Sequence, residues 1–167
     1  MDSEKCAGDL HRMLIGDVAE VAELEQAVSP GPWSPSIFLD CFKADYECWV
    51  LRADGIAGFA IASLGAGEAH LLNLAVTPSK QGLGFGGQLL RKIIGVVKEK
   101  GAERIFLEVR PSNLRAQAIY QRAGFEFLGK RLKYYGAPRR EDALVYTCLL
   151  YTSPSPRDVE ESRMPSS

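Results

Sequence analysis

The chain has 167 residues, of which 46% are hydrophobic and 25% are charged, and its formal net charge at pH 7 is −1. This length and composition are typical of one globular domain with its own core, and they argue against fibrous and largely disordered proteins. A net charge so close to zero creates no general field for nucleic acid or anionic lipid, so we expect neither a nucleic-acid nor a membrane partner.

The cysteines and the N-terminal segment argue against further classes of protein. The four cysteines form no C-x-x-C pair, and two histidines are too few for a zinc cluster, so we expect free thiols and no metal site. The first residues are polar, and no long apolar run follows them, which argues against a signal peptide or a membrane-spanning helix. We therefore expect a cytoplasmic protein, and the lack of a partner-sized apolar motif favours a monomer.

Hydrophobic periodicity predicts the elements of the N-terminal half. A short strand is expected at residues 11–15, followed by a helix that Asp17 caps and a second, shorter helix at residues 36–43. Three strands, joined by tight turns, are expected to form an antiparallel meander: residues 47–52, 58–64 and 70–76.

The C-terminal half alternates strands and helices. An apolar stripe predicts a helix at residues 86–100, a buried strand follows at 104–109, and a second amphipathic helix ends at Gly124. Two final strands flank a loop at residues 134–140: residues 125–132 and 142–150. The pattern predicts an α/β domain over residues 10–150, with a mixed, mostly antiparallel central sheet flanked by helices.

The composition changes abruptly at Tyr151. Residues 151–167 are rich in Ser, Pro and charge without apolar periodicity, so we expect this tail to be disordered. Its onset in the middle of a strand pattern suggests the hypothesis that the tail is not native to the gene.

A glycine-rich turn precedes the helix at residues 86–100. Gly82, Gly84, Gly86 and Gly87 allow backbone N–H groups to approach a ligand without a Cβ in the way, and the helix points its positive end toward the same place. The turn therefore predicts a binding site for a pyrophosphate group.

The same glycines also match the dinucleotide fingerprint G-x-G-x-x-G, with Glu108 about 20 residues further on. In a dinucleotide fold, however, the first glycine directly follows the first strand. Here a segment with Pro78 separates Val76 from Gly82, and strand-like runs precede the motif. A nicotinamide or flavin site is therefore the weaker interpretation.

Three stretches carry a combination of motifs that is more specific than the glycines alone. They are Asn73-Leu74-Ala75-Val76-Thr77-Pro78 with Gln81-x-x-Gly84-x-Gly86, then Leu107-Glu108-Val109-Arg110-Pro111-Ser112-Asn113 with Ala118-Ile119-Tyr120 and Gly124-Phe125, and lastly Tyr134-Tyr135 with Arg140-Glu141-Asp142-Ala143. In this order and spacing they resemble the GCN5-related N-acetyltransferases. Within that family they resemble most the bacterial branch that acetylates the N-terminal alanine of a ribosomal protein.

The resemblance implies acetyl-CoA as co-substrate and a protein N-terminus, that of a ribosomal protein, as acceptor. It implies Glu108 as the general base and Tyr120 as the general acid in a direct attack on the thioester. The residues implied to hold acetyl-CoA are Leu74, Ala75, Val76, Gly82, Leu83, Gly84, Phe85, Gly86, Gly87 and Asn113.

Each assignment has a structural alternative. Glu108 could be a strand-end acid paired with Arg104 or Arg110, Tyr120 a core aromatic, and Asn113 a helix cap. The acceptor could be a lysine side chain, another N-terminus or a small amine, and the chain could be a non-catalytic acyl-CoA-binding module.

The sequence also departs from the family. Gly82 and Leu83 stand where relatives usually carry Arg, Lys or Gln, so we expect phosphate binding to depend more on the backbone. Packing roles are the safer expectation for Trp33 and His70.

Overall fold

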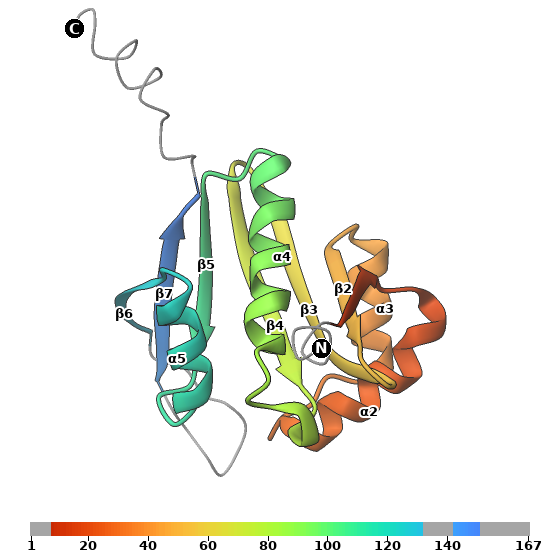
Figure 1. The fold of residues 1–167 in the computed structure, drawn as a ribbon. Coiled ribbons are helices and arrows are strands. Elements are labelled where there is room, and N and C mark those ends of the chain that lie inside the picture. Colours follow the sequence, from red (N-terminus) through yellow and green to blue (C-terminus); the bar gives the residue numbers. More distant parts are fainter. Residues whose placement is uncertain (1–7, 132–141, 151–167) are drawn as a thin grey trace, which may run out of the picture.

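A seven-stranded sheet with helices on both faces makes up the part of the chain that the computed structural model describes, residues 8–131 and 142–150 (Figure 1). The predicted loop at residues 134–140 and the predicted tail at 151–167 lie outside the described residues. In chain order the elements are β1 (Asp9–Arg12), η1 (Ile15–Asp17), α2 (Val18–Val28), α3 (Pro35–Lys43), β2 (Glu47–Arg52), β3 (Ile56–Gly65), β4 (Glu68–Val76), η2 (Pro78–Lys80), α4 (Phe85–Glu99), β5 (Arg104–Val109), α5 (Leu114–Arg122), β6 (Glu126–Arg131) and β7 (Ala143–Leu149). The predicted fold class is confirmed.

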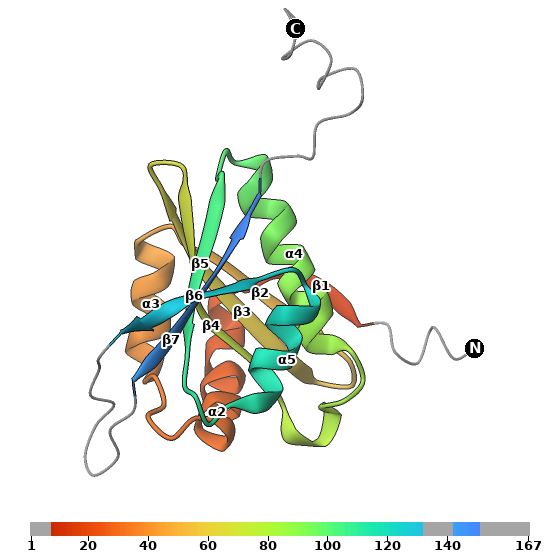
Figure 2. The same cartoon turned by 90° about the vertical axis from the view of Figure 1, so that its left-hand side faces the viewer.

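The strands lie in the order β1-β2-β3-β4-β5-β7-β6. All neighbouring pairs are antiparallel except β4 and β5, which are parallel and are connected through α4. Seen along the sheet, α4 and α5 cover one face and α2 and α3 cover the other (Figure 2). The predicted meander is present as β2, β3 and β4.

The parallel pair separates halfway along β4. Glu68 to Leu71 pair with Arg104 to Leu107, and β4 then continues to Val76 paired with β3 alone. The register with β3 shifts at this point, because Ile61 lies opposite Asn73 while Ala62 lies opposite Leu71, which leaves Leu72 as an extra residue. Such a bulge bends a strand and increases its twist. The bulge therefore turns the second half of β4 away from β5.

Two apolar clusters hold the helices on the sheet. Four residues of the predicted stripe of α4, Leu89, Leu90, Ile93 and Val97, are at 0% exposure against one face, and the fifth, Ile94, is partly buried. On the other face Phe38 of α3 makes an edge-to-face contact with Phe59 of β3, their ring centroids 5.5 Å apart. Full burial of one such side chain stabilises a fold by about 1.5–3 kcal/mol, so α4 is firmly anchored.

The N-terminal strand is shifted from its predicted position. The expectation of a strand at residues 11–15 was wrong, because β1 covers Asp9–Arg12 and Ile15–Asp17 form a 3-10 turn. Leu14 and Ile15 are 63% and 69% exposed. Met13 is buried in a core cluster, but the ladder with β2 ends at Arg12, so apolar character alone placed the strand too late.

Two buried carboxylates, Asp17 and Glu47, form ion pairs with arginines of β1 and β2. Asp17 stands at the N-cap position of α2, yet its carboxylate accepts hydrogen bonds from the Leu14 N–H and from Arg52 rather than capping the helix. Glu47 accepts from the Trp49 indole and pairs with Arg12 and Lys100. Burial opposes ionisation of both acids, but these hydrogen bonds and cations outweigh it and lower both pKa values.

Candidate active site

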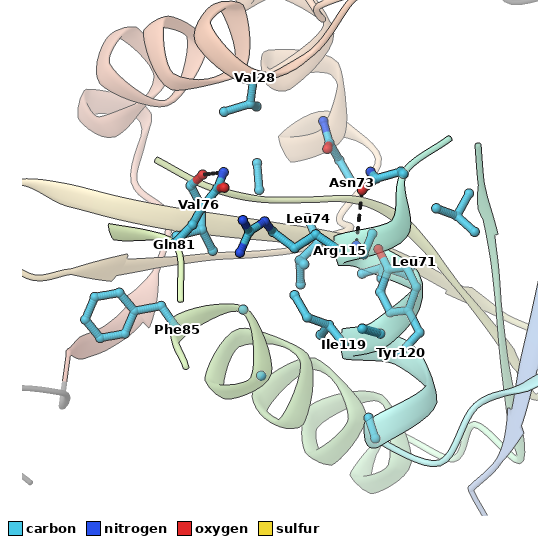
Figure 3. Close-up of a pocket in the computed structure, with 18 of the residues that line it drawn as sticks. Val28, Leu71, Asn73, Leu74, Val76, Gln81, Phe85, Arg115, Ile119 and Tyr120 are labelled. Carbon is cyan, nitrogen blue, oxygen red and sulfur yellow. Dashed lines mark hydrogen bonds between the residues drawn. The ribbon is translucent and has the colours of Figure 1, made fainter. Parts of the chain in front are cut away.

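A cavity of about 1210 Å³ opens where β4 leaves β5. Its walls come from the second half of β4, the glycine-rich turn, the first turns of α4 and α5, and the end of α2 (Figure 3). Because α2 lies on one face of the sheet and α4 and α5 on the other, the cavity passes through the sheet. All predicted site residues line it except Leu83, whose side chain is 45% exposed.

Two glycines of the glycine-rich turn adopt backbone conformations that favour glycine. Gly82 and Gly84 have φ angles of 87° and 88°, a region that residues with a side chain rarely adopt. Gly84 is the N-cap of α4, and the first intrahelical bond runs from the Gln88 N–H to the Gly84 carbonyl. The amides of the first turn before Gln88 have no partner within the helix, and they are available to an anion.

Gln81 connects this turn to the strand before it. Its side-chain Nε2 donates to the Val76 carbonyl over 3.0 Å, the bond drawn at the left of Figure 3. Leu74, Ala75 and Val76 pair with β3 on one side only. Their backbone groups on the β5 side have no ladder partner among the described residues, so this stretch can hydrogen-bond an extended ligand.

Glu108 lies near the end of β5. Along this strand Ile105, Leu107 and Val109 are buried in the cluster that contains α4, so Glu108 projects from the opposite face. Its side chain is 25% exposed, and its Oε2 lies 3.2 Å from Nη1 of Arg131 on β6. The carboxylate therefore faces the α2 side of the sheet, held by an exposed arginine.

Tyr120 comes from α5, on the other side. It is 6% exposed and packs against Phe125, with ring centroids 5.9 Å apart. Burial raises the pKa of its phenol, so the hydroxyl stays protonated through neutral pH. The core-aromatic interpretation is thus correct for the ring, while the side chain also lines the cavity beside Ile119 (Figure 3).

Asn113 is positioned both as a helix cap and as a residue of the cavity wall, the two roles considered for it. Its side-chain oxygen accepts from the Ala116 N–H over 3.1 Å and so caps α5, and the residue also lines the cavity. Trp33 packs against Phe38 and His70 stacks on Phe106, and neither lines the cavity, as expected of packing residues.

Six charged residues line the cavity without having been predicted as site residues: Glu25, Lys80, Arg91, Arg110, Arg115 and Arg122. Arg91 of α4 and Arg115 of α5 line its α4–α5 side, and Glu25 of α2 lines the opposite side. Glu25 is 2% exposed and its Oε2 accepts the Trp33 N–H over 3.0 Å. Arg91 lies four residues after Gly87, so helical spacing from the motif could have indicated it. Arg115 lies two residues after Asn113, a spacing that does not put two side chains on one helix face, so the motif gave no signal for it.

Among the described residues no group of His, Cys, Asp or Glu could hold a metal ion. No helix in that part of the chain is both long and apolar enough to cross a membrane.

Comparison with known proteins identifies the family. The profile described as "Acetyltransferase (GNAT) family" matches residues 18–125. The chain belongs to the GNAT acetyltransferase family. This membership confirms the resemblance to the family, and the match covers the first two motif stretches, since it ends at the Gly124-Phe125 pair.

Several GNAT relatives share one name. The ribosomal protein bS18-alanine N-acetyltransferase of Haemophilus influenzae is 38% identical over 137 residues, covering 80% of this chain and 93% of the relative. Its counterpart from Escherichia coli K12 is 35% identical over 131 residues, covering 77% and 88%. The crystal structure of the Escherichia coli ribosomal-protein-S18-alanine N-acetyltransferase superimposes with a TM-score of 0.80 at 30% identity, covering 89% of this chain and 97% of that one. The GNAT fold is therefore confirmed over most of the chain.

Proposed function

We propose that this GNAT protein transfers the acetyl group of acetyl-CoA to the N-terminal α-amine of a ribosomal protein that begins with alanine. The observation that carries the proposal is the cavity that passes through the sheet at the β4–β5 separation, with Tyr120 on the α4–α5 side and Glu108 projecting toward the α2 side. Two substrates can therefore enter from opposite faces and meet at the gap.

The residues of the α4–α5 side fit acetyl-CoA. The first-turn amides of α4 have no partner within the helix, which supports a diphosphate site there, as at other helix N-termini that bind phosphate. The unpaired edge of Leu74–Val76 can hydrogen-bond the pantetheine arm, and one of its N–H groups can polarise the thioester carbonyl. Because Gln81 ties Val76 to the turn, the two parts of this site keep a constant spacing.

The residues of the α2 side fit an amine. An α-amino group has a pKa near 8 and is mostly protonated at pH 7, so it must lose a proton before it attacks. Glu108 is assigned that proton, either directly or through a water molecule. The neutral amine nitrogen then bonds to the carbonyl carbon and the carbon–sulfur bond breaks. The leaving sulfur takes a proton from the Tyr120 hydroxyl, and the second proton released by the nitrogen, as it becomes an amide, restores that hydroxyl through water.

Substrate choice rests on the relatives. The bS18-alanine N-acetyltransferases that match this chain at 35–38% identity cover most of its length, which supports the same acceptor here. We propose a monomeric, cytoplasmic enzyme whose catalytic domain spans residues 10–150.

The test measures the release of CoA thiol from acetyl-CoA in the presence of short peptides that differ only in their first residue. An N-terminally blocked peptide with an internal lysine is the control. We expect turnover with the free alanine terminus and none with the blocked peptide. Turnover confined to the blocked peptide would move the acceptor to lysine, and CoA binding without turnover on any peptide would contradict peptide acetylation.

A further inference from the structure

The glycine-rich turn carries no positive side chain. Residues 81–87 read Gln-Gly-Leu-Gly-Phe-Gly-Gly, so the turn offers only backbone groups to a phosphate. Lys80 comes just before the turn, but its Nζ donates to the carbonyls of Ala53, at 2.5 Å, and Asp54, at 2.9 Å. A helix N-terminus supplies only about half a positive charge, which leaves most of the charge of a diphosphate unbalanced.

Arg91 brings a guanidinium group back to this turn. Side chains of a helix lean toward its N-terminus, and Arg91 lies one turn after Gly87. Its Nη1 lies 3.3 Å from the position that a Cβ of Gly87 would occupy. The absence of a side chain at Gly87 thus leaves space beside the first turn of α4, and the Arg91 guanidinium lies there.

Arg115 reaches the same region from α5. Figure 3 shows its side chain extending across the cavity, with the guanidinium directed toward Gln81 and Val76 and away from its own helix. Among the described residues, neither Arg91 nor Arg115 has a hydrogen bond or a carboxylate partner. Two unpaired arginines from different helices that line one cavity are suited to a shared anion.

We propose that Arg91 and Arg115 bind the diphosphate of the CoA co-substrate and supply the positive charge that the glycine-rich turn lacks. This inference rests on the proposed function, since it assumes CoA in the cavity. In this proposal CoA is bound by the turn and by two side chains, Arg91 of α4 and Arg115 of α5.

The experiment measures dissociation constants of CoA and of dephospho-CoA, which retains the diphosphate but lacks the 3′-phosphate, by titration calorimetry. The variants are Arg91→Gln and Arg115→Gln, with the lysine variants Arg91→Lys and Arg115→Lys to restore charge. Arg104→Gln is the matched control, because Arg104 is an arginine on β5 that does not line this cavity. Both target side chains are exposed, so thermal midpoints should stay at the wild-type value.

Charge-assisted hydrogen bonds predict that each glutamine variant raises the dissociation constants of both ligands about 10-fold or more. Each lysine variant should recover part of that loss, and the control should change neither constant. Wild-type affinity in both glutamine variants would overturn the proposal. Weakened CoA binding with unchanged dephospho-CoA binding would also overturn it, because the arginines would then contact the 3′-phosphate. Failure of the wild-type protein to bind CoA would instead refute the proposed function.

Discussion

Gly58 of β3 stands where α4 and the end of β4 meet, so Gly58→Ala tests how this part of the site is packed. A Cβ at this position would lie 2.6 Å from the Ala75 carbonyl oxygen and 2.8 Å from Cδ1 of Leu89. Both distances are shorter than real Cβ contacts, and one neighbour is backbone. Leu89 is fully buried, so the added methyl group must push α4 away from the end of β4.

Overpacking of this kind costs about 1–3 kcal/mol. Loss of a glycine returns about 0.4–1 kcal/mol by restricting the unfolded chain, which leaves a net destabilisation of roughly 1–2 kcal/mol. For a domain of this size, the expected fall in the thermal midpoint is about 2–8 °C. The N-terminal turn of α4 moves with the helix, so we also expect CoA to bind several-fold more weakly.

Gly65→Ala is the matched control, because Gly65 ends the same strand and a Cβ there would have no heavy atom within 4 Å. We expect this variant to be as stable as the wild type or up to about 1 kcal/mol more stable. Urea titration followed by tryptophan fluorescence measures both variants. If Gly58→Ala proved as stable as Gly65→Ala, the close packing of α4 on β3 and β4 would be refuted.

Three further predictions concern catalysis and acid stability. Glu108→Gln should lower kcat on an alanine peptide by a factor of about 10²–10⁴ and leave the CoA dissociation constant unchanged. Steady-state kinetics measures the first quantity and calorimetry the second. Retained turnover would show that Glu108 is not the base. Tyr120→Phe keeps the buried ring, so we expect wild-type stability with a loss of kcat of at least about 10²; an unaltered kcat would limit Tyr120 to packing. The lowered pKa values of Asp17 and Glu47 stabilise the fold fully above their usual values of 3.8 and 4.5, and this contribution disappears as the pH falls through the lower folded-state values. The urea midpoint should therefore stay level from pH 7 to about pH 5 and decrease at pH values below about 4.5. This decrease should be smaller in Glu47→Gln. An equally steep decrease in that variant would contradict the role of Glu47.

Much of the fold could be predicted from local patterns. The helix predicted at residues 86–100 is α4 within one residue at each end, and the strands predicted at 47–52 and 104–109 match β2 and β5. The helix has an apolar stripe of helical period, and the two strands are short apolar runs, one followed by the turn at Gly55 and the other preceded by the turn at Gly101. The weakly patterned segment at residues 11–15 was misplaced, since its strand is decided by pairing with β2.

The candidate site was predicted in part for the same reason. Gly82 and Gly84 have the positive φ angles that their residue type indicates, and Asn113 caps α5 as its position suggests. Leu83 was included because of its place in the motif, yet its side chain is directed away from the cavity, which depends on the rotation of the turn. Arg131 was not foreseen as the partner of Glu108, because β7 lies between β5 and β6 in the sheet and the chain order does not reveal this arrangement.

The sequence by itself determined most of the elements and the glycine-rich turn, because each depends on neighbours within a few positions, while the candidate site residues came from the family resemblance. Only the tertiary structure decided that β4 leaves β5 after Leu71, that Glu108 and Tyr120 lie on opposite sides of the resulting gap, and that Arg91 and Arg115 line the same cavity. These features depend on the register between strands and on packing between helices that are distant in the chain. The register with β3 shifts by one residue at Leu72, just where β4 leaves β5, and no local propensity predicts that shift.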